Sequence, residues 1–226
     1  MHILVINPNS TATMTASIAA AAGDAASAST RITALNPLDG PPAIQGAEDG
    51  EKALPGLFDL FDAEVIKRGG YDAAVIACFD DTGLWDLKAR SNIPVLGIGE
   101  AAYHAAMMIT AKFSVVTTLA VSVPVLEGNL ERYGFASRCA RVRASGVPVL
   151  DIEAAKDQSQ EAIADEIGRA CKEDGCDAIV LGCAGMADLA AEMTARFGLP
   201  VIDGVAAAIG FCEALARPTP WKGVTV

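Results

Sequence analysis

Histidine is scarce in this sequence, with only His2 and His104 among 226 residues. Since His2 belongs to the expected first strand, one histidine is left, which argues against a His-ligated metal site and against a Ser-His-Asp triad. None of the six cysteines forms a C-x-x-C pair, and Cys171 and Cys176, the closest two, match no zinc spacing. The sequence therefore predicts no metal centre.

Basic residues are also few: 17 Lys and Arg stand against 28 Asp and Glu, a formal net charge of -11. Nucleic-acid binding normally needs a basic face, so we expect no nucleic-acid partner. No uninterrupted apolar run approaches the ~18 residues of a membrane span. The N-terminus lacks the basic lead of a secretory signal. We therefore expect a cytoplasmic protein with no membrane association, in which the cysteines are free thiols.

Short β-branched runs alternate with alanine-rich stretches, which is typical of an α/β fold with parallel sheets flanked by helices. The expected strands are 2–7, 30–35, 72–77, 94–97, 113–118, 141–149, 177–182 and 200–202. The expected helices are 11–28, 48–69, 83–90, 100–111, 123–133, 158–174, 186–197 and 204–215. Several of these strands are apolar throughout, as expected when both faces of a sheet are covered.

The two halves of the chain repeat one another. The segment 70–78, GYDAAVIAC, matches 175–183, GCDAIVLGC, at an offset of 183 − 78 = 105 residues. The segments 93–96 and 99–102 likewise match 199–202 and 204–207. This internal duplication predicts two pseudosymmetric lobes, one formed by 1–98 plus 205–226 and the other by 99–204, with equivalent positions facing each other across a cleft.

Cys78 and Cys183 occupy equivalent positions just past a strand end, where the ligand crevice of a parallel sheet lies. Free backbone N–H groups at a helix start lower a thiol's pKa and can hold an enolate oxygen. Two such thiols suit a two-base reaction, in which a thiolate removes a proton from one face of a carbon next to a carbonyl and a thiol returns one to the other face.

Each of these features also has a purely structural interpretation. A free cysteine in an apolar strand is usually a small buried hydrophobe, and duplication alone could preserve an inert pair. We interpret Cys139, Cys171, Cys176 and Cys212, which have no counterpart in the repeat, as structural.

The other motifs are weaker. The G-x-G-x-x-A segment at 97–102 resembles a dinucleotide turn, but it follows the fourth strand, and tight helix packing explains its glycines. Asp80-Asp81 could act as bases or metal ligands, or could charge a helix start. The segment 7–10, NPNS, either lines the crevice or caps a helix.

Taken together, these segments make the chain resemble the aspartate/glutamate racemase superfamily, and within it the hydantoin and allantoin racemase branch. The matching pieces are NPNS at 7–10, GPPAI at 40–44, ACFDDTGL at 77–84, PVLGIGEAA at 94–102, VTTL at 116–119 and LGCAGM at 181–186. The resemblance implies two flavodoxin-like lobes with the active site between them. It also implies a homo-oligomer, a tetramer or hexamer, that needs no cofactor and uses Cys78 and Cys183 as its acid/base pair.

Details of the second motif favour a cyclic ureide, allantoin or a 5-substituted hydantoin, as substrate. Enzymes that resemble glutamate racemase carry a histidine soon after the second cysteine, where this chain has Ala184-Gly185-Met186. Arylmalonate decarboxylases keep only one of the two cysteines, whereas this chain has both. Gln45 departs from the acidic residue expected there. The expected binding residues are Asn9, Ile44, Phe79, Asp80, Thr117, Thr118, Ala184 and Gly185, with Ile44 and Phe79 meeting the substituent and amides at 79–80 and 184–185 holding ring carbonyls.

Three alternatives stay open at this stage. A maleate isomerase would use one cysteine for covalent addition to an alkene. An amino-acid racemase of the same superfamily would keep the two-base chemistry on another substrate. A non-catalytic two-lobed binder would use the cysteines only for packing. Deuterium exchange at a substrate stereocentre in D2O separates the racemases from the binder.

Overall fold

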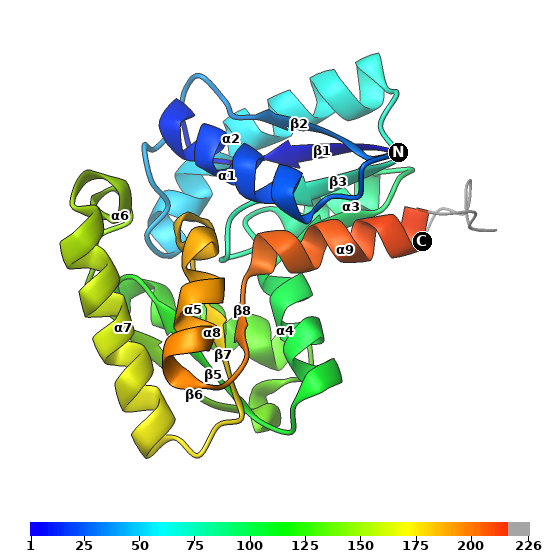
Figure 1. Cartoon of the computed structure of the whole chain (residues 1–226). Helices are drawn as coiled ribbons and strands as arrows, with labels where there is room; N and C mark the ends of the chain where they lie inside the picture. Colours follow the sequence, from blue (N-terminus) through cyan, green and yellow to red (C-terminus); the bar gives the residue numbers. More distant parts are fainter. Residues whose placement is uncertain (217–226) are drawn as a thin grey trace.

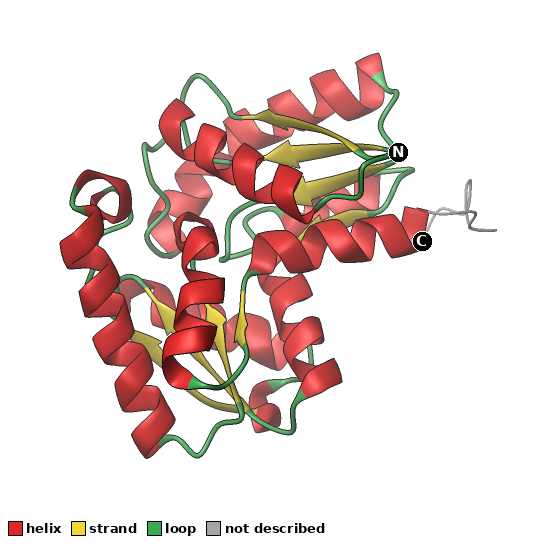
Figure 2. Cartoon of the chain, in the orientation of Figure 1, coloured by secondary structure: helices red, strands yellow, loops and turns green. Residues whose placement is uncertain are grey.

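The computed structural model describes residues 1–216, which form two four-stranded sheets flanked by helices (Figure 1, Figure 2). The first sheet has the order β2 (Arg31–Leu35), β1 (His2–Ile6), β3 (Ala73–Ile76) and β4 (Val95–Gly97). The second has the order β6 (Cys139–Ala144), β5 (Phe113–Thr117), β7 (Ala178–Leu181) and β8 (Val201–Ile202). All of these pairings are parallel. The predicted α/β fold with two pseudosymmetric lobes is confirmed.

The strand registers repeat as the duplication predicts. Ala73 of β3 pairs with Ile3 of β1, and Ala178 of β7, 105 residues further on, pairs with Phe113 of β5. Every residue of β3, β5 and β7 is buried, which explains why β3 and β7 are apolar without alternation. The carboxyl ends of β3 and β7 therefore lie at equivalent edges of the two sheets.

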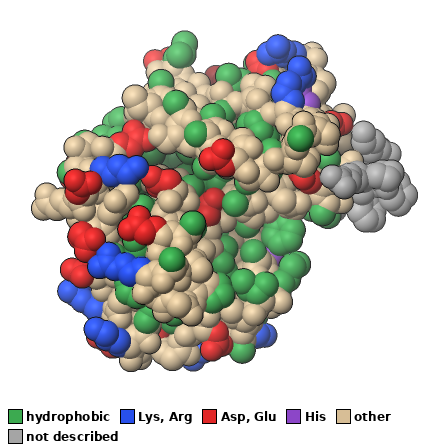
Figure 3. Space-filling model, in the orientation of Figure 1, with side chains coloured by type: hydrophobic (Ala, Val, Ile, Leu, Met, Phe, Trp, Pro, Cys, Tyr) green, Lys and Arg blue, Asp and Glu red, His purple; other side chains and the backbone are tan. Residues whose placement is uncertain are grey.

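Helices cover both sheets. They are α1 (Ala12–Ala25), α2 (Ala47–Phe61), α3 (Leu84–Arg90), α4 (Ile98–Ile109), α5 (Val123–Arg132), α6 (Asp151–Ala154), α7 (Lys156–Glu173), α8 (Ala190–Phe197) and α9 (Gly204–Ala216). The other helical segments are the π-helix η1 (Asp62–Arg68) and the 3-10 turns η2 (Ala120–Ser122), η3 (Ala136–Arg138) and η4 (Ala184–Leu189). None of the helices in residues 1–216 combines the length and apolar character that a membrane span requires. On the face in Figure 3, acidic and basic side chains are interspersed along α6 and α7.

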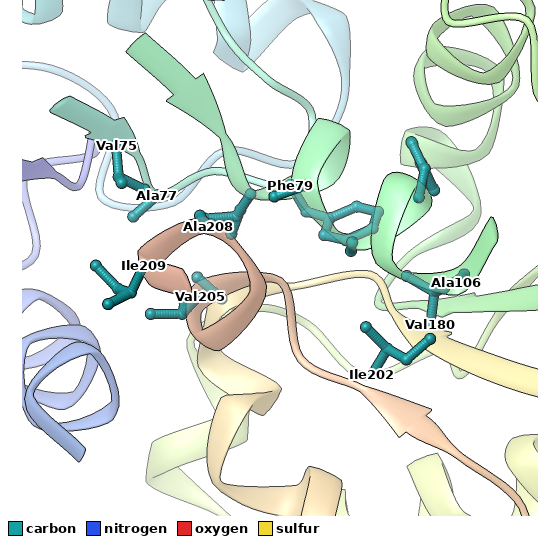
Figure 4. Close-up of a cluster of buried hydrophobic side chains, with 14 of the residues drawn as sticks. Val75, Ala77, Phe79, Ala106, Val180, Ile202, Val205, Ala208 and Ile209 are labelled. Atoms are coloured by element: carbon teal, nitrogen blue, oxygen red, sulfur yellow. The ribbon is translucent and has the colours of Figure 1, made fainter. Parts of the chain in front are cut away.

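Two helices join the lobes. α4 follows the first sheet yet packs on β7 and β8, whereas α9 follows the second sheet and packs on β3 and α1. Figure 4 shows α9 side chains such as Val205 and Ala208 between the first sheet and the second. The division into 1–98 plus 205–226 and 99–204 stays a proposal, and its last ten residues, 217–226, lie outside the described part of the chain.

Several element boundaries differ from the sequence-based predictions. The strand expected at 141–149 runs only from Cys139 to Ala144, because Gly146 has a left-handed φ of 80° and Pro148 has no N–H for a ladder. The helix expected at 48–69 changes from α2 into the π-helical η1. The helix expected at 186–197 begins as the 3-10 turn η4 before α8. α6 was not predicted at all.

Candidate active site

Both repeated cysteines line one pocket between the lobes. Cys78 and Cys183 follow the ends of β3 and β7 by two residues each, and both side chains are half-buried. The space around them, counted with the part open to solvent, is about 390 Å³. Its lining residues are Asn7, Asn9, Met14, Ile44, Ala77, Cys78, Phe79, Asp80, Thr117, Thr118, Ser122, Val149, Gly182, Cys183 and Ala184.

The Cys78 thiol lies in a tight turn. The Thr82 hydroxyl donates a hydrogen bond to its Sγ at 3.5 Å, and the Asp81 N–H closes the turn on the Cys78 carbonyl at 3.0 Å. Burial and then the charge of Asp80 raise the pKa of Cys78 well above its ordinary value, although the Thr82 hydroxyl and the Asp80 N–H favour the thiolate. The resting group is therefore a thiol.

Cys183 has a different environment. Thr117 Oγ1 donates to the Gly182 carbonyl at 2.9 Å and so fixes the strand end beside the thiol. The Gly185 N–H favours the Cys183 thiolate, but burial outweighs it and raises the pKa of Cys183 to about 11. The expectation that helix starts lower both pKa values is therefore wrong. The α3 helix begins only at Leu84, six residues after Cys78, whereas Cys183 directly precedes η4. At both sulfurs, removal from water outweighs the nearby amides.

Asp80 lies beside both thiols, and its charge raises the pKa of Cys78 and of Cys183. Its Oδ2 is buried and has no hydrogen-bond partner within residues 1–216. Burial raises the pKa of Asp80 to about 7, although the Gly46 N–H favours the carboxylate. Its counterpart in the repeat, 105 residues on, is Gly185. The two cysteine loops are therefore equivalent in backbone position but not in charge.

Asp81 anchors the Cys78 loop to α4. Its Oδ1 accepts from the Gly99 N–H at 3.0 Å, and its Oδ2 accepts from the Glu100 N–H and the Tyr133 hydroxyl, each at 2.7 Å. A Cβ at Gly97 would lie 1.9 Å from Asp81 Oδ1. The glycines of the G-x-G segment therefore leave space for the Asp81 carboxylate, which caps the N-terminus of α4. This supports the interpretation that they serve helix packing, rather than dinucleotide binding.

Most of the expected binding residues line the pocket: Asn9, Ile44, Phe79, Asp80, Thr117, Thr118 and Ala184 do, and Gly185 does not. Asn9 also shapes the backbone, since its Oδ1 accepts from the Thr11 N–H and from Asn7 Nδ2, each at 2.9 Å. The Phe79 ring packs edge-on against Tyr103 in the core, with centroids 5.4 Å apart, and Figure 4 shows it directed toward α4. The expected contact of this ring with a substituent does not fit that packing.

Sequence reasoning missed part of the pocket. Val149 was assigned to a strand, and Met14 and Ser122 lie on helical segments with no motif of their own. Gly146 and Pro148, two residues that break strands, were the available signal that Val149 belongs to a loop. Within the described residues, no group of three or more His, Cys, Asp or Glu side chains is arranged to hold a metal ion.

Comparison with known proteins gives consistent matches. The model of the Asp/Glu/Hydantoin racemase family matches residues 3–212. Hydantoin racemase of Rhizobium meliloti is 45% identical over 215 residues, which are 95% of this chain and 88% of that enzyme. Allantoin racemase from Klebsiella pneumoniae superimposes with a TM-score of 0.91 at 42% identity, covering 95% of this chain and 87% of that one. Allantoin racemase from Pseudomonas fluorescens gives 0.92 at 39% identity, covering 96% and 91%.

Proposed function

Because the chain belongs to the Asp/Glu/hydantoin racemase family, we propose that it racemises allantoin or other 5-substituted hydantoins by passing protons through Cys78 and Cys183. The racemase activity itself, an isomerase reaction, follows from identities of 39 to 45% to hydantoin and allantoin racemases over nearly the whole chain. The observation that supports the mechanism best is that the two repeated thiols line one pocket from equivalent strand ends.

The proposed reaction needs one thiolate and one thiol. The thiolate takes the proton from the ring carbon between a carbonyl and an amide nitrogen, and the electron pair of the broken C–H bond moves onto the carbonyl oxygen as an enolate. The opposite thiol then protonates the other face of the carbon, which leaves a thiol and a thiolate with exchanged roles. Cys183 has a pKa of about 11 and Cys78 a higher one, so Cys183 ionises first in the free enzyme.

The pocket offers matching groups for a cyclic ureide. The unpartnered Oδ2 of Asp80 is the group we assign to a ring N–H, since a buried acceptor without a partner gains most from a donor. Ile44 and Val149 are the apolar side chains assigned to the 5-substituent. The remaining proposed contacts are Asn9, Thr117, Thr118, Ala184 and the backbone amides of 79–80 and 184–185.

The finer expectations about the whole protein also belong to this proposal. We infer that the enzyme works in the cytoplasm without a cofactor and as a homo-oligomer of four or six chains. All six cysteines are free, which fits a reducing compartment.

Cys78→Ser and Cys183→Ser test the mechanism. In D2O the wild type should deuterate the stereocentre of either enantiomer while it racemises it, as followed by NMR and polarimetry. Each variant should lose racemisation, and each is expected to keep exchange on one enantiomer only, a different one in each case. Cys171→Ser, which replaces a thiol on α7 outside the pocket, serves as the matched control and should still racemise. Normal racemisation by either cysteine variant would refute the two-base assignment.

A further inference from the structure

The segment 145–154, which includes the loop after β6 and the short helix α6, lies against the pocket from the second lobe. Val149 lines the pocket and packs with Met14, Ala43 and Cys183. Ile152 lies beside the Cys183 loop, since a Cβ at Gly185 would be 3.3 Å from its Cδ1. This segment therefore forms one wall of the site, and we call it the 145–154 wall.

Gln45 ties this wall to the first lobe. Its side-chain Oε1 accepts a hydrogen bond from the Val149 N–H at 3.0 Å in a partly buried setting. Its own N–H donates to Asp49 Oδ2 at 3.3 Å. The preceding Ile44 lines the pocket, so one short segment both contacts the site and holds its opposite wall.

The backbone around Gln45 has little room to move. A Cβ at the next residue, Gly46, would lie 2.9 Å from the carbonyl oxygen of Val121 in the second lobe. The Gly46 N–H also favours the charged form of Asp80. The Gln45 side chain is thus presented to Val149 from a backbone that is itself fixed between the lobes.

A second contact links the wall to the first lobe, but it lies in water. Ser17 Oγ on α1 donates to Glu153 Oε1 at 2.7 Å, and this bond is exposed. An exposed hydrogen bond competes with solvent, whereas loss of the partner of a partly buried N–H leaves that group unsatisfied. The Gln45–Val149 bond is therefore the one expected to hold the wall in place.

We propose that Gln45 is a positioning residue, which holds the 145–154 wall closed over the substrate and thereby sets affinity and the size of the 5-substituent that fits. The inference rests on the proposed function for its substrate class. Gln45 acts through Val149, because it is Val149 that reaches the pocket. Its loss should weaken binding while the two thiols keep their positions.

A matched pair of substitutions tests this inference. Gln45→Met keeps the length of the side chain and removes the acceptor, whereas Gln45→Glu keeps an acceptor at the same position. We expect Gln45→Met to raise KM about two- to tenfold, the factor that corresponds to one hydrogen bond, with kcat close to wild type. In Gln45→Met, the ratio of kcat/KM for small over bulky 5-substituents should move closer to one. Gln45→Glu should keep KM close to the wild-type value.

Hydrogen exchange followed by mass spectrometry gives a readout that needs no turnover. The peptide containing Val149 should exchange faster in Gln45→Met than in the wild type, and Ser17→Ala should leave both this rate and KM unchanged. Unchanged exchange in Gln45→Met, or an equal effect of Ser17→Ala, would overturn the assignment to Gln45. Absence of racemisation by the wild type would instead refute the proposed function and leave the exchange result interpretable.

Discussion

Replacing Asp80 by asparagine should stabilise the protein at neutral pH. Burial raises the pKa of Asp80 from an ordinary 3.8 to about 7, and its Oδ2 has no partner within residues 1–216. A difference of about three pH units corresponds to about 4 kcal/mol between the folded and unfolded proteins. Asparagine has nearly the shape of the protonated acid and carries no charge at any of these pH values.

The sign of this effect follows from proton binding. Between pH 4 and 7 the folded protein holds the Asp80 proton more tightly than the unfolded chain, so the contribution of Asp80 to stability falls as pH rises through this window. The asparagine variant lacks this loss. The free energy of unfolding of Asp80→Asn minus that of the wild type should therefore grow from near zero at pH 4 to about 4 kcal/mol at pH 8.

Urea unfolding of both proteins at several pH values measures the difference directly. Asp81, whose pKa burial also raises, is present in both proteins and cancels. Asp59→Asn replaces an exposed carboxylate on α2 and should change the unfolding free energy by less than about 0.5 kcal/mol. A stability difference for Asp80→Asn that stays constant from pH 4 to 8 would refute the reasoning.

Two further predictions concern the thiols and the helix cap. Since the pKa of Cys183 is about 11, kcat/KM should rise about tenfold per pH unit from pH 8 to 10. Alkaline racemisation without catalysis is measured with Cys78→Ser and subtracted. A plateau of kcat/KM that begins below pH 8 would contradict this prediction. Gly99→Ala places a Cβ 2.5 Å from the Phe79 carbonyl oxygen and should destabilise the protein by about 1–3 kcal/mol. In Gly210→Ala on α9, the new Cβ would have no other part of residues 1–216 within 4 Å, apart from its chain neighbours and its own helix backbone. This variant should instead stabilise the protein by about 0.5–1 kcal/mol. Similar urea midpoints for the two variants would count against the cap.

The centre of the site could be predicted because it depends on repetition and strand ends. An offset of 105 residues placed Cys78 and Cys183 at the ends of β3 and β7, and parallel sheets bind ligands at that edge. The same logic found Thr117, which is the last residue of β5. These features are local in sequence, or recur at a fixed spacing, so a single chain is enough to reveal them.

The rest depends on contacts between distant segments. Val149 reaches the pocket from a loop that is hydrogen-bonded to Gln45, 104 residues away, and no periodic pattern encodes such a bond. The pKa of each thiol depends on all the groups that exclude water from it. The nearby amide donors alone therefore predicted a lowered pKa, whereas both pKa values are raised. The Phe79 ring packs in the core against Tyr103 of α4, a contact between separate elements that no local pattern encodes.

The unequal charge of the two cysteine loops has a consequence for the kinetics of the two enantiomers. Mirror-image substrates have equal free energies in water, so the equilibrium constant of racemisation is one, and kcat/KM must be the same in both directions. Asp80 on one loop and Gly185 at the equivalent position of the other therefore cannot make the enzyme prefer one direction. They can only change kcat and KM by the same factor for one enantiomer relative to the other. One enantiomer is then bound more tightly and turned over more slowly than its mirror image.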